Sequence, residues 1–191
     1  MKKLLTVLIL IFTLQTPSWA DDIRDFQIEG VSIGDSALDY FSEEKILNNR
    51  ATYFKNKTYT PVEIYDESFG IYDVVQFGYK TGDKNYTILG LAGNIEYPNN
   101  VKSCYKKMDE IVTELTRLFK NIAQITGKET EVSTIDKPGD TRKASVAYWF
   151  DSKDVVVVAC YDYSEESGYT DNLSVSVDTK EYNEFLGIAY K

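Results

Sequence analysis

Residues 101–126 read VKSCYKKMDEIVTELTRLFKNIAQIT, and apolar side chains recur in this stretch at intervals of three and four. That spacing predicts one long amphipathic helix, with charged residues on the opposite, solvated face. Asn99 or Asn100 offers a cap at its start, and Gly127 marks its end. This is the strongest helical signal in the chain, and the rest of the fold is interpreted around it.

Outside this helix the apolar period changes to two, which is typical of strands. Residues 69–97 alternate as a strand pair with a tight turn at 82–85. Residues 155–161 are mainly apolar and predict a central strand buried on both faces, whereas the alternation at 173–178 predicts a strand covered on one side. The other predictions are an extended lead-in at 23–34, a helix after Asp35 or Ser36 with a second start near residue 42, an edge strand at 60–65, a mobile loop at 127–143, a strand at 145–150 and a last helix at 180–186.

The order of these elements is helix then strands, followed by helix then strands. We therefore expect residues 21–191 to form a single α+β domain. Its predicted core is an antiparallel sheet of five to seven strands with the long helix packed across one face. The two halves resemble weak α-then-β repeats.

Residues 1–20 predict a cleavable secretory leader. Two lysines open the segment, residues 4–14 form an apolar run, and Ser18 and Ala20 are the small residues that signal peptidase requires. As a helix, such a run covers roughly 16 Å, about half of a bilayer's hydrocarbon core, so a permanent anchor is the weaker alternative. We expect a periplasmic or secreted chain that begins near Asp21 and does not insert into a membrane.

Composition excludes several classes of function. The 191 residues include no histidine and two cysteines, and their formal net charge is −9. Without histidine there is no Ser/His/Asp triad, no Cys/His nucleophile pair and no imidazole-ligated metal. The negative charge repels nucleic acid and anionic lipid. We therefore expect no metal, no cofactor and no nucleic-acid partner.

The two cysteines, Cys104 and Cys160, both lie in the part of the chain that we expect to be exported. Because thiols oxidise outside the cytosol, a Cys104–Cys160 disulfide is the first prediction. The alternative is two buried thiols that lie far apart.

Fifteen tyrosines are the most unusual feature of the composition. Several aromatic residues bracket an acidic segment at 162–172, and rings beside carboxylates hold sugars or cationic peptides. The predicted binding residues are Trp149, Tyr161, Tyr163, Glu165, Glu166 and Tyr169. The alternative is that tyrosine fills half-buried sheet positions, where its ring packs and its hydroxyl reaches water.

Carboxylates are the remaining candidates for catalysis. A glycoside hydrolase needs two of them facing each other across a cleft, and the candidates are Asp151, Asp154, Asp162, Glu165 and Glu166. Asp151 and Asp154 also suit a hairpin turn, where aspartate bonds to the turn's own backbone. The acidic segment with Asp171 offers oxygen ligands for calcium, but its spacing fits no EF-hand.

Residues 28–38, with the sequence IEGVSIGDSAL, resemble the opening of small bacterial envelope domains of the SmpA/OmlA (BamE-like) and β-lactamase-inhibitor-like group. That resemblance implies a short helix packed on an antiparallel sheet. It does not imply lipid anchoring, because the chain has no lipidation cysteine after its apolar run. Residues 33–46, 104–110, 160–166 and 173–185 resemble a group of uncharacterised exported proteins of marine alphaproteobacteria, which implies a periplasmic protein and brings no catalytic residues.

These features favour a secreted, non-enzymatic binding or interaction module of the periplasm, whose partner is an unidentified protein or small ligand. The alternatives are a carboxylate-dependent hydrolase acting on polysaccharide and an accessory factor of envelope assembly, the latter resting on fold analogy.

Overall fold

The computed structural model describes residues 23–127, 129–132 and 141–189. The predicted leader at 1–20 lies outside these residues. The strands of the main sheet are β3 (Tyr59–Tyr65), β4 (Val74–Lys80), β5 (Gly90–Glu96), β6 (Ala123–Ile125), β7 (Glu129–Val132), β8 (Arg142–Phe150), β9 (Val155–Asp162) and β10 (Asn172–Asp178). The helices are α1 (Glu43–Asn48), α2 (Val101–Phe119) and α3 (Lys180–Leu186), and the shorter elements are β1 (Gln27–Ile28), β2 (Val31–Ser32) and the 3₁₀ turns η1 (Ile23–Asp25), η2 (Ala37–Asp39) and η3 (Glu165–Ser167).

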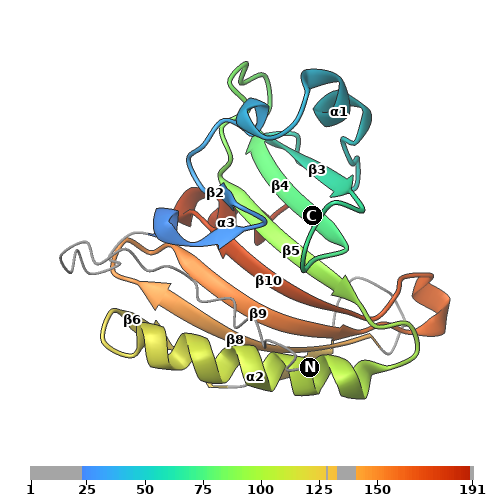
Figure 1. Cartoon of the computed structure of the whole chain (residues 1–191), viewed down its shortest axis with the longest axis vertical. Helices are drawn as coiled ribbons and strands as arrows, with labels where there is room; N and C mark the ends of the chain where they lie inside the picture. The colour runs from blue at the N-terminus through green and yellow to red at the C-terminus, as the bar shows by residue number, and fades with distance from the viewer. Residues whose placement is uncertain (1–22, 128, 133–140, 190–191) are drawn as a thin grey trace, which may run out of the picture.

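The main sheet is antiparallel and follows the order β3-β4-β5-β10-β9-β8-β6, with β7 also paired to β8 (Figure 1). Two three-stranded meanders, β3-β4-β5 and β8-β9-β10, make up most of it. The last strand of one meander pairs with the last strand of the other, from Gly90↔Asp178 to Glu96↔Asn172. The predicted α+β class, with its antiparallel sheet and long helix, is confirmed.

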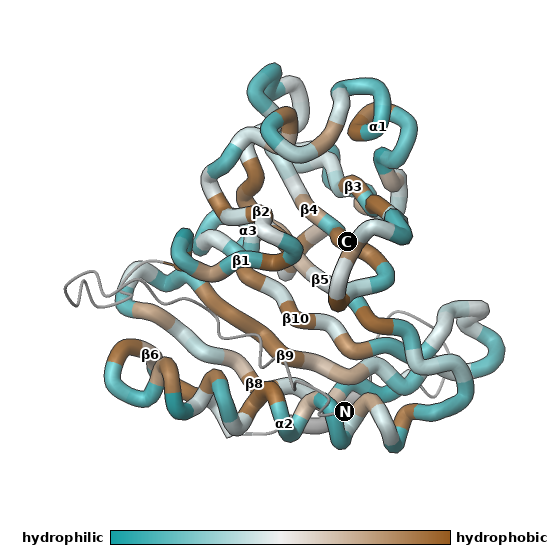
Figure 2. The backbone as a smooth tube through the Cα atoms, viewed as in Figure 1, coloured by the Kyte–Doolittle hydropathy of each residue, from teal (hydrophilic) through white to brown (hydrophobic). Residues whose placement is uncertain are grey.

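One face of the sheet carries the main core. Partners across neighbouring strands share a face, so Leu91, Val177 and Val156 lie in one row on this side. α2 packs here against β9 and β10, and the β1–β2 hairpin packs beside it against β5 (Figure 1). Figure 2 shows hydrophobic residues along the central strands and alternating hydropathy along α2. Within the described residues, no helix has the length and apolar character needed to cross a bilayer.

α3 covers part of the opposite face. Its Tyr182 and Phe185 pack with Phe54, Tyr59 and Ala189 in a second apolar cluster. The Tyr182 ring lies directly on Gly78 and Gly90, which are partners in the β4–β5 ladder. A Cβ at either glycine would lie far inside van der Waals distance of that ring, so the close approach of α3 requires glycine at both positions.

α2 begins as predicted and ends earlier than predicted. The Asn100 side chain accepts a hydrogen bond from the Ser103 amide, so Asn100 is the N-cap. The helix stops at Phe119, and residues 123–125 form β6 against the end of β8. The prediction of helix up to residue 126 was wrong because periodicity does not reveal the unpaired edge of β8, whose backbone groups this segment satisfies.

The connection between β4 and β5 also differs from the prediction. Instead of forming a strand straight after a tight turn at 82–85, residues 86–88 pair with the segment near Asp35. The Gly34 amide donates to the Ile88 carbonyl at 2.8 Å, and the Ile88 amide donates to the Asp35 carbonyl at 2.9 Å. β5 therefore begins only at Gly90.

The structure also tests the predicted short helices, the edge and central strands and the loop at 127–143. Ser36 and Ser42 cap η2 and α1, which confirms two helical starts after residue 34. β3 is an edge strand, β9 is central, and α3 has the predicted bounds. The predicted loop at 127–143 instead contains β7 and the start of β8, while residues 128 and 133–140 lie outside the described part.

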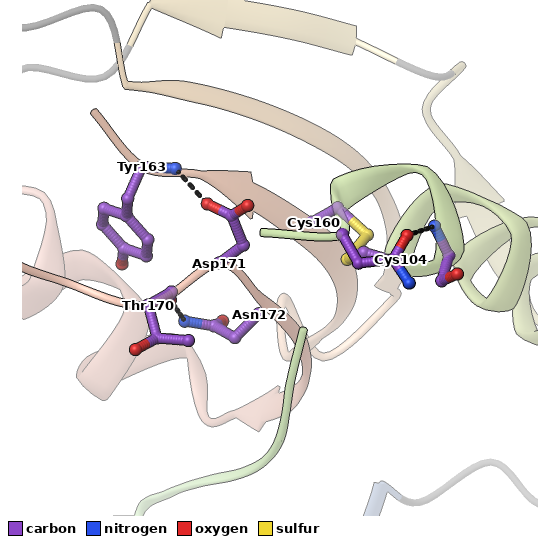
Figure 3. The surroundings of a disulfide bond; sticks show 8 residues. Cys104, Cys160, Tyr163, Thr170, Asp171 and Asn172 are labelled. Carbon is purple, nitrogen blue, oxygen red and sulfur yellow. Dashed lines mark hydrogen bonds between the residues drawn. A yellow bond between two sulfur atoms is a disulfide. The ribbon is translucent and has the colours of Figure 1, made fainter. Parts of the chain in front are cut away.

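The predicted disulfide is confirmed. Cys104 on α2 is bonded to Cys160 on β9, with their Cα atoms 6.0 Å apart (Figure 3). Both residues are fully buried. The bond fastens the long helix to the centre of the sheet. An extracytoplasmic location is compatible with this bond.

Candidate binding surface

Three of the predicted binding residues form a continuous series of rings. Tyr161, at the end of β9, stacks nearly parallel on Tyr163, with ring centroids 5.6 Å apart and an interplanar angle of 13°. Tyr163 contacts Tyr169 at 5.2 Å between centroids. Tyr161 and Tyr163 are half-buried, whereas Tyr169 is 61% exposed. We call these three residues the tyrosine surface.

The loop that carries these rings is held by its own backbone and by neighbouring elements. Asp171 accepts a hydrogen bond from the Tyr163 amide at 2.8 Å, which closes the base of the loop (Figure 3). The Asp171 carbonyl also accepts from the Tyr97 amide at 2.7 Å. Between these anchors η3 ends at Gly168, whose φ of 71° is readily adopted by glycine. The rings are therefore presented by an ordered loop.

Acidic side chains lie behind and beside the rings. Burial and the neighbouring Asp171 raise the pKa of Asp162, and Arg142 opposes this shift. Burial, followed by the charges of Asp162 and Asp171, raises the pKa of Tyr105 on α2. Glu165 and Glu166 are exposed on η3. Asp162 faces the α2 side of the sheet, opposite Tyr161, whereas Glu165 and Glu166 belong to the loop that carries the rings and are the most open to solvent.

A cation already lies over one of the rings. The Lys143 ammonium lies 6.0 Å from the centroid of the Tyr161 ring. Lys143 is opposite Tyr161 in the β8–β9 ladder, so the register places the two side chains on the same face. At this distance the ring quadrupole attracts the charge. Tyr161 therefore has a cation–π contact within the protein.

The structure does not bring Trp149 to this surface. Trp149 pairs with Val155, at the start of β9, whereas Tyr161 lies near the end of the same strand. Six residues of strand separate Trp149 from Lys143, which corresponds to roughly 20 Å. The prediction that Trp149 joins the tyrosines was therefore wrong, since it assumed that neighbouring strands place these aromatic residues at the same end.

The five carboxylates considered for hydrolysis are divided in the same way. Asp151 and Asp154 lie in the turn before β9, and Asp154 accepts a hydrogen bond from the Lys180 amide at 2.8 Å. Asp162, Glu165 and Glu166 lie beyond the other end of that strand. No pair drawn from the two groups can face across one cleft. Among the described residues, no group of three or more potential metal-binding side chains is assembled.

Sequence reasoning missed Lys143, whose ammonium lies over Tyr161. It also missed Tyr105 and Arg142, which lie near Asp162 on the α2 side of the sheet, opposite the Tyr161 ring. Their proximity depends on the helix–sheet packing and on the β8–β9 register. The predicted bond between Cys104 and Cys160 was a signal that α2 lies against β9, which is why Tyr105 lies near Asp162.

Comparison with known proteins finds no match among protein families, curated proteins or solved structures. The family resemblances noted from the sequence remain predictions.

Proposed function

We propose that this protein is an exported, non-enzymatic binding protein that captures basic peptide segments on its tyrosine surface. The observation that carries this proposal is the unbroken contact of Tyr161, Tyr163 and Tyr169, which ends in a largely exposed ring on the loop that also carries Glu165 and Glu166. A lysine or arginine side chain docked on Tyr169 would meet both a ring face and a negative potential. Export is supported by the predicted leader and is compatible with the disulfide.

Charge favours a basic partner over an acidic one. The chain has 30 acidic and 21 basic side chains. The side chains of Glu165 and Glu166 are exposed and make no hydrogen bond or ion pair with other residues of the described part. Carboxylates without partners attract cations over about a Debye length, roughly 8 to 10 Å at ordinary ionic strength. The expected binding is therefore sensitive to salt.

Binding is tested with a fluorescently labelled oligolysine peptide, and an oligoglutamate peptide of the same length serves as the negative probe. Tyr169→Ala should weaken oligolysine binding by about fivefold or more, because it removes a cation–π contact and its surrounding contact area. Tyr65→Ala is the matched control, because Tyr65 is 62% exposed and lies on the edge strand β3, which β4 and β5 separate from β10. Both variants should keep the unfolding free energy within about 0.5 kcal/mol of the parent.

A second pair of variants tests the charge. Glu165→Gln combined with Glu166→Gln should weaken oligolysine binding and reduce its salt dependence. Glu44→Gln combined with Glu67→Gln removes the same charge from exposed positions on other elements and should change binding much less. Equal effects of the two pairs would mean that only net charge matters. Equal binding of oligolysine and oligoglutamate would refute the proposal.

A further inference from the structure

A cleft of about 790 Å³ lies away from the tyrosine surface, where the N-terminal segment meets the β4–β5 connection and the turn before β9. Its lining includes Ile23, Arg24, Ser32, Asp35, Thr87 and Asp154. These residues come from three separate stretches of the chain. The volume lies in the range of small-molecule sites, which are commonly about 300 to 1,000 Å³.

Backbone hydrogen bonds fix the walls of this cleft. The pairing of residues 34–37 with 86–88 holds the N-terminal segment against the β4–β5 connection. The Thr179 amide donates to the Leu89 carbonyl at 2.9 Å and joins that connection to the start of α3. Asp154 accepts from the Lys180 amide and fixes the third wall. The cleft is therefore formed before any ligand binds.

Ser32 supplies a polar group that has no hydrogen-bond partner among the residues that the structure describes. The residue is 6% exposed and lines the cleft, and its hydroxyl makes no hydrogen bond within the described part of the chain. The residue is otherwise buried, so the cleft is the side from which the hydroxyl can be reached. A ligand or an ordered water in the cleft would supply one.

Three charged side chains line the cleft, namely those of Arg24, Asp35 and Asp154. Asp35 accepts a hydrogen bond from the Tyr40 hydroxyl through Oδ2, and Asp154 accepts from the Lys180 amide through Oδ1. The other oxygen of each carboxylate has no partner among the described residues. Arg24 brings a positive charge beside them, because its side chain passes Gly34 with Nε 3.8 Å from the position of a Cβ there. One guanidinium and two carboxylates therefore line the same cleft.

We infer that this cleft binds a small zwitterion with an additional positive charge, namely a free basic amino acid such as lysine or arginine. Arg24 would bind the α-carboxylate in charge-assisted hydrogen bonds. The unpartnered oxygens of Asp35 and Asp154 would each accept from one of the two cationic groups. Ser32 would complete the polar contacts, and Ile23 would pack against the aliphatic part of the side chain.

The test is a titration of the ¹⁵N-labelled protein with L-lysine and L-arginine, followed through backbone amide signals. The amides of Gly34, Ile88 and Thr179 should shift together and follow one dissociation constant. L-norleucine, which lacks the side-chain charge, and N-acetyl-lysine amide, which lacks both α charges, should each bind about tenfold more weakly or worse. These comparisons use the unmodified protein and do not depend on the stability of any variant.

Substitutions test which charged residues of the cleft bind lysine. Arg24→Gln and Asp154→Asn should each weaken lysine binding by about tenfold or more. Asp151→Asn is the matched control, because Asp151 belongs to the same turn as Asp154 and does not line the cleft. Tyr169→Ala should leave the lysine-induced shifts of Gly34, Ile88 and Thr179 unchanged, which separates this cleft from the tyrosine surface.

Three results would overturn the inference. One is the absence of any shift at Gly34, Ile88 and Thr179 with either basic amino acid. Another is equal binding of lysine and its capped amide. The third is unchanged binding by both cleft variants when their melting temperatures match that of the parent.

Discussion

The contact between α3 and the sheet predicts a large effect of one added methyl group. In Gly90→Ala the new Cβ would overlap Tyr182 and would lie 2.8 Å from Asp178 Oδ1. Carbon atoms in contact are ordinarily about 3.5 to 4.0 Å apart, so the ring has to move away from the strand. The ring is edge-on to Tyr59 and contacts Phe185, which leaves it little room.

The loss of unfolding free energy caused by Gly90→Ala has a lower and an upper bound. Overpacking by one methyl group in a tight core costs about 1 to 3 kcal/mol. The upper bound is complete loss of the Tyr182 packing, because removal of a large buried aromatic ring costs roughly 3 to 5 kcal/mol. An alanine in place of glycine returns about 0.4 to 1 kcal/mol by restricting the unfolded chain. We expect Gly90→Ala to lower the free energy of unfolding by about 2 kcal/mol or more.

Equilibrium unfolding in urea with the disulfide intact measures this effect. Gly127→Ala is the control, because in the described part of the chain no heavy atom beyond its chain neighbours lies within 4 Å of its added Cβ. In a Tyr182→Ala background, Gly90→Ala should cost much less, since the obstructing ring is gone. A cost that is the same in both backgrounds, or a Gly90→Ala variant as stable as the parent, would refute this account of α3 docking.

Three further predictions concern the disulfide, the protonation of Asp178 and the distance of Trp149 from the tyrosine surface. Replacing Cys104 and Cys160 by alanine should lower the free energy of unfolding by about 4 kcal/mol, estimated from the entropy of closing a loop whose ends are 56 residues apart. Denaturant unfolding checks this, with the m-value fitted separately for each protein because the open chain exposes more surface. Burial raises the pKa of Asp178 to about 7, above its unfolded value of about 3.9, so the folded state binds the proton more tightly. Stability should therefore fall by up to about 4 kcal/mol as pH rises from about 4 to about 7, and an Asp178→Asn variant that kept the same pH slope would contradict this. Trp149 fluorescence should not change when oligolysine binds, and a shift in its emission would place binding elsewhere.

Much of the local structure was accessible from the sequence because it depends on neighbouring residues. The Asn100 cap, the central position of β9 and the bounds of α3 follow from capping chemistry, apolar runs and periodicity. The disulfide followed from the expected compartment and from the presence of only two cysteines. None of these inferences required knowledge of which strands pair.

What the sequence did not predict depends on pairing between distant segments. β6 leaves the helical pattern to occupy the edge of β8, and residues 86–88 pair with the N-terminal segment. The same distinction between local and long-range information applies to the residues of the candidate site. The nearby tyrosines were found together, whereas Trp149 was misplaced because strand direction and register decide which end of β8 it occupies.

The position of the disulfide has a consequence for how the molecule opens. Cys104 and Cys160 both follow β5 in the chain, so their bond closes only the second half of the molecule. The β3-β4-β5 meander is attached to that half through the β5–β10 ladder and through apolar contacts. Partial unfolding should therefore be unequal: the first meander separates as one cooperative unit while the cross-linked half stays compact. In hydrogen exchange, the amides of β3 and β4 would lose protection before those of β9.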